Sequence, residues 1–253
     1  MSDSDSGDGQ PQQFPNTSLT LHQRLQSDNP LESKKAMEEF LNRYWNSMYV
    51  FMRAQGESHH DASDLVQEFS LTQLISQGQL VKWEPGRAKL RSYLKTILDR
   101  FRKKEYRKES AQKRGGPKAI THISMDFDLA QSLYDSGAQN HDSPDLAFDR
   151  EWAESIIQKV MANLSGAYNE KGKLEEFQLL IRNLSGRSSE ADRITYREIA
   201  LKLQTSEENV KQKMIALRTR FQKSLSALVQ DTVSPEEFED EMNFILGVTT
   251  GSL

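Results

Sequence analysis

The chain has 253 residues, of which 36% are hydrophobic and 28% charged, with no cysteine and a formal net charge of −4. The lack of cysteine excludes disulfides and thiolate zinc sites and is typical of a reducing, cytoplasmic compartment. No apolar run approaches the roughly 20 residues that cross a bilayer, and the acidic, polar start does not resemble a signal peptide, so we expect no membrane association.

Positive charge is concentrated in two stretches of the chain. Residues 100–118 carry nine Lys or Arg against two acids, and residues 209–223 carry five against none. Acidic stretches follow both, at 121–151 and 231–241. Because a phosphate backbone responds to the local field rather than to the net charge, this pattern favours a nucleic-acid partner.

The first 108 residues predict a disordered tail followed by a helical domain. Residues 1–28 are rich in Ser, Asp, Gly, Gln and Pro, which is typical of disorder. In residues 29–108 apolar residues recur at three- and four-residue steps, which predicts amphipathic helices. The predicted helices are Leu31–Ala54, a second from the N-cap Asp61 to Gly78, and Leu90–Lys108. We expect these helices to pack as one all-helical domain.

The helix Leu90–Lys108 combines an apolar stripe with a strongly basic opposite face. Such a helix can be buried on one side and lie along a polyanion on the other, and a merely solvated basic face is the alternative. Aromatic residues beside positive charge suit unpaired bases, which stack on rings while Lys and Arg follow the backbone. Tyr93 and Phe101 also fall on the apolar stripe, however, so their spacing alone favours a place in the core.

Helical periodicity is lost in residues 109–148, which we expect to be an extended acidic linker, and returns in residues 149–230. There Thr195 begins a capping box, and Ser206 is the expected N-cap of a longer helix after a short turn. A short capped helix, a tight turn and a longer helix with a basic outer face make a helix-turn-helix. The sequence therefore predicts an all-α fold of two small helical domains, with an acidic tail helix in residues 231–253.

The helix-turn-helix supplies candidate DNA contacts. The N-terminal half of its second helix meets base edges in the major groove, and basic residues further along neutralise phosphates. The candidates are Glu208, Asn209, Lys211, Gln212 and Lys213 for base edges, and Arg218 and Arg220 for phosphates. A helical hairpin with a solvated basic side is the alternative.

The chain shows no catalytic constellation. The adjacent His59 and His60 point to different sides of a helix, and no other ligand cluster lies near them in the sequence. There is also no glycine loop of the Walker or dinucleotide-binding type. We therefore expect neither an enzyme nor a bound metal or cofactor.

Three stretches resemble bacterial RNA polymerase sigma factors of the extracytoplasmic-function (ECF) group. Asp61–Phe69 looks like the family signature DAxDLVQExF, and Trp83–Leu94 resembles FDPxxGRFRxWL. Asn209–Arg218 lines up with TVKSRLHRAR, the recognition helix of that family. With its AQKRGGP stretch and its acidic tail, the chain is similar to a subgroup with large representation in planctomycete bacteria.

The resemblance implies a factor for transcription initiation, with sigma region 2 at residues 29–108 and sigma region 4 at residues 149–230. In that family the first signature helix docks on the clamp helices of the polymerase beta-prime subunit, and region 4 meets the beta flap and the minus-thirty-five element. The implied polymerase contacts are Asp64, Leu65, Gln67 and Glu68. The implied contacts to minus-ten DNA are Arg91, Tyr93, Lys95, Arg100, Lys103 and Lys104.

The partners that this resemblance implies are core RNA polymerase and promoter DNA, and an anti-sigma factor or another regulator is also compatible with it. Two other hypotheses remain. The first is a free-standing helix-turn-helix regulator that binds duplex DNA without polymerase. The second is a helical enzyme of unrecognised type.

Overall fold

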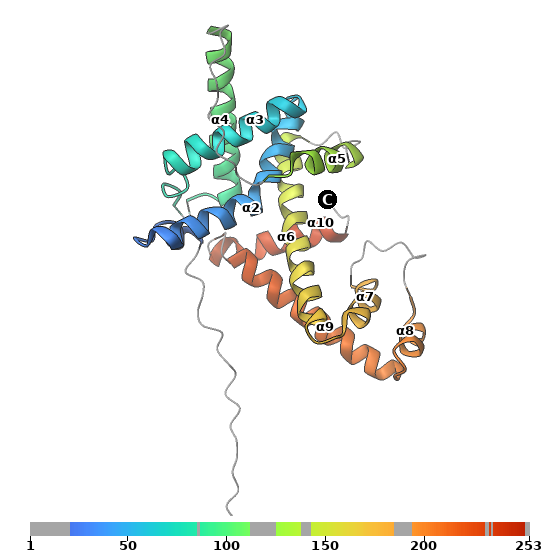
Figure 1. The fold of residues 1–253 in the computed structure, drawn as a ribbon. Coiled ribbons are helices and arrows are strands. Elements are labelled where there is room, and N and C mark those ends of the chain that lie inside the picture. The colour runs from blue at the N-terminus through green and yellow to red at the C-terminus, as the bar shows by residue number, and fades with distance from the viewer. Residues whose placement is uncertain are drawn as a thin grey trace, which may run out of the picture.

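The part of the chain that the structure describes is made almost entirely of helices (Figure 1). The structure is a computed structural model that describes residues 21–84, 87–111, 125–137, 143–184, 194–230, 233 and 235–250, and no strand occurs in these ranges. The elements are α1 (Leu21–Leu25), α2 (Pro30–Ala54), α3 (His59–Phe69), the π-helix η1 (Ser70–Ser76), α4 (Leu90–Ala111), α5 (Phe127–Gly137), α6 (Pro144–Asn169), α7 (Leu174–Ile181), α8 (Tyr196–Lys202), α9 (Glu207–Gln230), the 3₁₀ turn η2 (Pro235–Glu237) and α10 (Phe238–Thr250). The predicted all-α fold is confirmed for the described residues.

The two long helices α2 and α6 form the centre of the fold (Figure 1). Aromatic side chains from both helices are buried between them, with Phe51 of α2 and Phe148 of α6 edge to face at 6.2 Å. Trp152 of α6 is also buried. The helix α6, which was expected to open a second domain, therefore shares a hydrophobic core with α2. The division of the chain into two domains stays a prediction.

Two segments expected to be irregular are helical. Within the predicted tail, α1 buries Leu21 and Leu25 against α2; residues 1–20 lie outside the described part of the chain. Within the predicted linker, α5 places Phe127 against Trp45 of α2, with ring centroids 5.3 Å apart. α1 has only five residues, too few to show periodicity. In α5 the core-facing Phe127, Ala130 and Tyr134 do recur at three- and four-residue steps, so the helical pattern is present among the acidic residues and was overlooked.

The second predicted helix begins earlier than expected and changes its winding. The N-cap is Ser58 rather than Asp61, because the Ser58 hydroxyl accepts a hydrogen bond from the Asp61 backbone N–H at 3.2 Å. From Ser70 the helix continues as a π-helix. Two hydroxyls there bond back to the preceding turn, those of Ser70 and Thr72, each at 2.7 Å. Such back-bonding competes with regular α-helical pairing and accompanies the changed winding.

The helix-turn-helix is present as α8 and α9. Thr195 and Glu198 form the predicted capping box, and the Asn209 backbone N–H donates to the Ser206 hydroxyl at 3.2 Å. Ile199 of α8 and Val210 of α9 are completely buried, so the two helices pack through the faces that periodicity predicts.

Candidate nucleic-acid interface

The apolar side of α4 faces the core, as its spacing predicts. Phe101 is buried and meets Phe69 of α3 edge to face at 5.5 Å. Trp83 is buried just before α4, and its ring N–H donates to the Ala88 carbonyl at 2.7 Å. Tyr93 is half-buried and donates its hydroxyl to the Gln79 carbonyl at 2.8 Å. These rings pack against the protein, so they do not form an open stacking surface.

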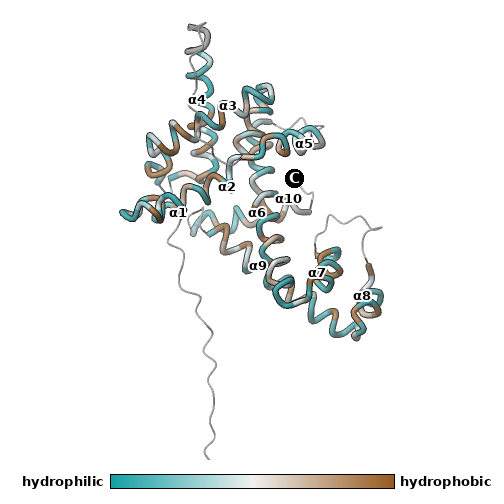
Figure 2. Tube along the Cα trace, in the orientation of Figure 1, coloured by the Kyte–Doolittle hydropathy of each residue, from teal (hydrophilic) through white to brown (hydrophobic). Residues whose placement is uncertain are grey.

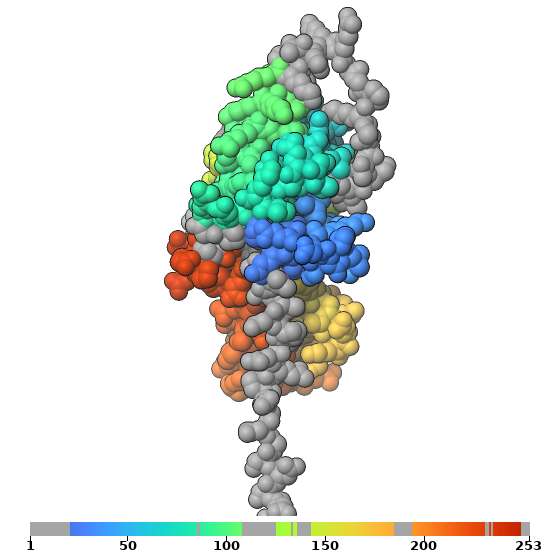
Figure 3. All heavy atoms as spheres, turned by 90° about the vertical axis from the view of Figure 1, so that its left-hand side faces the viewer, coloured from blue at the N-terminus to red at the C-terminus, as the bar shows by residue number. Residues whose placement is uncertain are grey.

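The outer half of α4, from Arg100 to Ala111, carries several exposed basic side chains. Figure 2 shows it as a hydrophilic stretch, and Figure 3 shows α4 and α3 on adjoining parts of one face. Arg100, Lys103 and Lys104 are exposed. Lys103 pairs with Asp99 at 2.6 Å, whereas neither Arg100 nor Lys104 meets an acid within the part of the chain that the structure describes. Both are therefore available to an external anion.

A surface hollow of about 660 Å³ runs along α4 from Ser92 to Lys103, and the paired Lys95 and Asp145 lie at its start. Its walls come from α4, from the end of α2 and from the first turn of α6; the lining residues include Ser92, Lys95, Thr96, Asp99, Arg100 and Lys103. Hydroxyl and basic side chains of this kind suit phosphate and sugar oxygens. The hollow is a candidate seat for a nucleic-acid backbone.

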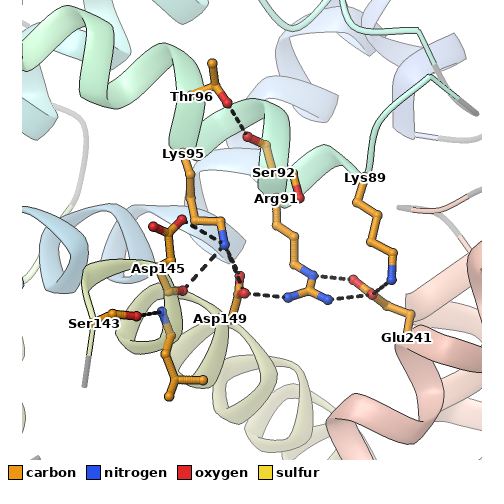
Figure 4. A network of polar contacts seen from close by, with 10 residues as sticks. Lys89, Arg91, Ser92, Lys95, Thr96, Ser143, Asp145, Asp149 and Glu241 are labelled. Atoms are coloured by element: carbon orange, nitrogen blue, oxygen red, sulfur yellow. Dashed lines mark hydrogen bonds and ion pairs between the residues drawn. The ribbon is translucent and has the colours of Figure 1, made fainter. Parts of the chain in front are cut away.

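The start of α4 is different, because its cations are already paired (Figure 4). The Arg91 guanidinium, only 10% exposed, holds Glu241 of α10 through Nε at 2.6 Å and Nη2 at 2.8 Å. Its Nη1 pairs with Asp149 of α6 at 2.8 Å. Lys95 pairs with Asp149 at 2.9 Å and with Asp145 at 3.3 Å. Two of the expected minus-ten DNA contacts thus bind carboxylates of the same chain.

The surroundings of Arg91 reinforce its positive charge. Burial opposes that charge, but the hydrogen bonds that Arg91 donates to Glu241 and the nearby Asp149 together raise the pKa of Arg91 above its ordinary value. The guanidinium also lies over the rings of Phe244 at 4.6 Å and Trp152 at 5.2 Å. Arg91 therefore joins α4, α6 and α10 at one point.

The N-terminal half of α9 presents most of its predicted base-edge residues to the surface. Glu208, Asn209, Lys211 and Gln212 are all exposed. They are held by local contacts only: Asn209 donates to the Thr205 hydroxyl at 2.7 Å, and Lys211 lies 3.6 Å from Glu208. Exposed pairs of this kind are weak, so the side chains can turn toward a ligand.

Other predicted contacts of α9 point elsewhere. Lys213 is half-buried and pairs with Glu176 of α7 at 2.5 Å. It therefore links α9 to α7 and does not belong to the exposed residues at the start of α9. Arg220 lies over the Tyr168 ring at 5.6 Å, which turns it toward the end of α6. Arg218 is exposed. Lys211, Arg218 and Arg220 are thus the predicted cations of α9 that are exposed, and Arg220 lies against an aromatic ring at the same time.

The predicted polymerase contacts lie on α3. Asp64 is exposed, while Leu65, Gln67 and Glu68 are half-buried. Three- and four-residue steps place Asp64 beside Gln67 and Glu68 on one side of the helix. Leu65 packs partly against the core and so orients this row.

The described residues contain no group of three or more His, Cys, Asp or Glu side chains able to hold a metal ion. His59 is instead bound to the Tyr49 hydroxyl at 2.9 Å. Within the same residues, no helix has both the length and the apolar character that a membrane span requires.

Three residues that matter in the structure were not identified from the sequence: Asp149, Glu151 and Glu241. Each was counted only as part of an acidic stretch. Of the three, only the burial of Glu241 could have been predicted, because this residue lies one turn from the apolar residues of a predicted amphipathic helix. No family model, no curated protein and no solved structure matches the chain.

Proposed function

We propose that the chain is a sigma factor, which directs core RNA polymerase to promoters in the cytoplasm and contributes no catalytic residues of its own. The observation that carries the proposal is the presence in one chain of two separate exposed surfaces suited to nucleic acid. One is the polar row at the start of α9, with Lys211 and the exposed Arg218 and Arg220 further along, and the other is formed by the exposed cations Arg100, Lys103 and Lys104 of α4. A factor that holds both duplex and melted DNA needs two such surfaces.

The helix α9 would read duplex DNA. Its first half is exposed and offers Asn209 and Gln212 to adenine, Glu208 to cytosine, and Lys211 to guanine or phosphate. The preceding helix α8 is fixed by its capping box and by the buried contact with α9. This arrangement matches the way in which a helix-turn-helix presents its second helix to the major groove.

The outer half of α4 would hold the melted strand. Arg100, Lys103 and Lys104 are exposed beside the hollow, and Tyr106 is 66% exposed close by. Base–aromatic stacking together with positive charge is the usual way to hold single strands. In this role Tyr106 replaces Tyr93, whose ring packs against the protein.

The helix α3 would bind the polymerase. Its row of Asp64, Gln67 and Glu68 is acidic and polar, with Asp64 exposed and the other two half-buried, and the helix lies on the same face of the molecule as α4 (Figure 3). Polymerase bound to α3 would therefore stand next to the strand that α4 holds. The resemblance of Asp61–Phe69 to the sigma signature supports this assignment.

The test is pull-down and run-off transcription with purified bacterial core polymerase. We expect the wild type to bind core and to start transcripts that depend on it, and we expect Asp64→Arg/Glu68→Arg to lose both activities. The control is Glu38→Arg/Glu175→Arg, which reverses two exposed acids away from α3. Failure of the wild type to bind core would reject the proposal, and equal loss in the control would reject the interface.

A free-standing regulator is the second candidate, because in this structure the reading half of α9 is exposed while the start of α4 is occupied by acids. Such a protein would bind a duplex operator tightly by itself. A sigma factor would bind duplex weakly alone and tightly with core enzyme. Duplex binding with and without core therefore separates the two candidates.

A further inference from the structure

The acidic helix α10 closes over the start of α4. Glu241, in the first turn of α10, is 1% exposed and accepts hydrogen bonds from Arg91 and, at 3.0 Å, from Lys89. The two partners precede it by 150 and 152 residues. Figure 4 shows the three side chains converging from α10 and from the start of α4.

The acids at this contact pair with Arg91 and Lys95, two of the side chains that were expected to bind DNA. Glu241 is bound by two nitrogens of one guanidinium, which is the geometry that arginine also uses for phosphate. The three cations Lys89, Arg91 and Lys95 face the three carboxylates Asp145, Asp149 and Glu241. Since these charges balance, the contact leaves little positive charge at the start of α4 for an external anion.

Apolar packing also holds α10 in place beside the start of α4. Ile245 and Val248 of α10 are buried, and Phe244 lies against the Arg91 guanidinium. The helix packs on α6 and on α9, not on the outer half of α4. Its ion pairs and ring contact at the basic helix involve Lys89 and Arg91, which do not line the hollow beside Arg100.

We propose that α10 is an intramolecular latch: its carboxylate Glu241 competes with nucleic acid for Arg91 and Lys89, so that α4 binds a strand along its full length only when α10 has moved away. The nucleic-acid part of this proposal rests on the proposed function. The buried contact itself does not.

The test compares Glu241→Gln with Glu239→Gln in the full chain. Both changes remove one negative charge from the first turn of α10, but Glu239 is exposed, so its variant is the matched control. Two quantities are measured on the protein without polymerase. They are the amide exchange rate of α10 and the dissociation constant for oligothymidylate of about 20 nucleotides, a length that spans more than one binding surface.

For Glu241→Gln we expect faster exchange in α10, unchanged exchange in α9, and a dissociation constant that falls roughly tenfold because a larger fraction of molecules is open. The control should change neither quantity. Unchanged exchange in α10 would overturn the latch, and so would faster exchange without tighter binding. Run-off transcription is measured in a separate experiment. A failure of the sigma-factor proposal can therefore be distinguished from a failure of the latch proposal.

A second variant keeps the test decisive if Glu241→Gln unfolds. A protease site placed between Gln230 and Pro235 is cut after folding, which frees α10 without changing its contacts. Dilution of the cut protein should then tighten oligothymidylate binding, and an added peptide of residues 235–250 should reverse this effect. The same peptide with Gln at position 241 should not. If neither cutting nor the added peptide changes the dissociation constant for oligothymidylate, the proposal is overturned.

Discussion

Glu151 of α6 accepts a hydrogen bond from the side-chain amide of Asn46 on α2, with 2.5 Å between the two atoms. The contact lies where the two central helices pack together. Burial raises the pKa of the Glu151 carboxyl above its ordinary value of 4.5, the neighbouring Glu154 raises it further, and Asn46 opposes both effects. The ionised form of Glu151 is thus disfavoured by folding.

Glu151→Gln should stabilise the protein at neutral pH. Because the folded-state pKa is raised, the stability linked to this group is fully present below about 4.5 and is lost as the pH rises through the folded-state value. Glutamine retains an acceptor for Asn46 and carries no charge. We expect the free energy of unfolding at pH 7 to rise by about 1 kcal/mol and its fall between pH 4 and 7 to flatten.

The matched control for Glu151 is Glu38→Gln. Glu38 stands on the outer side of α2 with its side chain 61% exposed. Its neutralisation should leave both the unfolding free energy and its pH dependence nearly unchanged. Equal stabilisation by the two variants, measured by urea unfolding at pH 4, 5.5 and 7, would contradict the assignment to Glu151.

The pair Arg91–Glu241 should be strongly coupled. Removing one member breaks a buried ion pair and leaves Arg91 with Asp149 alone, or Glu241 with Lys89 alone, so each single change, Arg91→Met or Glu241→Gln, should cost about 1–3 kcal/mol of stability. The double change should cost clearly less than the sum of the two single changes. A double-mutant cycle on the urea unfolding free energy measures this coupling.

A second ion pair serves as reference for that cycle. Arg87 and Glu84 also lie 3.0 Å apart, but their side chains are 80% and 65% exposed. Exposed pairs contribute little, so we expect a coupling below about 0.5 kcal/mol there. Similar couplings for both pairs would show that burial does not strengthen the contact at Glu241.

Lys211 and Lys213 should give opposite phenotypes although only one residue separates them. Lys211 is exposed, so Lys211→Ala should weaken duplex binding by about 1–3 kcal/mol if the side chain contacts a base. If it contacts only phosphate, the slope of the logarithm of the binding constant against the logarithm of the salt concentration should fall in magnitude by about one. Lys213 is paired with Glu176, so Lys213→Ala should lower stability and affect binding less. The measurements are duplex binding at several salt concentrations and thermal unfolding of both variants. Equal changes in affinity and in stability for the two variants would contradict the different roles of Lys211 and Lys213.

The capping box should make the helix-turn-helix sensitive to acid. Hydrogen bonds from the Thr195 backbone N–H and hydroxyl lower the pKa of Glu198, so its contribution is present above about 4.5 and is lost as the pH falls through the lower folded-state value. Thr195→Ala removes the N-cap hydroxyl and should cost about 1 kcal/mol at pH 7. Hydrogen exchange in α8 at pH 7 should rise in this variant, and unchanged exchange would contradict the role of the cap.

The sequence by itself determined the elements whose signals are local. The extent of α2, the capping box at Thr195 and the N-cap Ser206 all depend on residues within one helical turn. The structure confirms the capping box and the N-cap, and α2 ends at Ala54 as expected but begins at Pro30, one residue before the expected Leu31. The placement of Phe101 in the core follows from the same periodicity. The candidate reading row of α9 was also found in this way, because exposure on a helix follows from its spacing.

The tertiary structure alone decided which charges meet. Nothing near Arg91 in the sequence indicates that its partners are Asp149 and Glu241, since an ion pair between distant helices leaves no periodic pattern. The same holds for Lys213, which looks like its neighbour Lys211 until α7 is placed beside it. Periodicity predicts which side of a helix is apolar, but the partner of a charged side chain depends on how the helices pack, and that depends on the whole core.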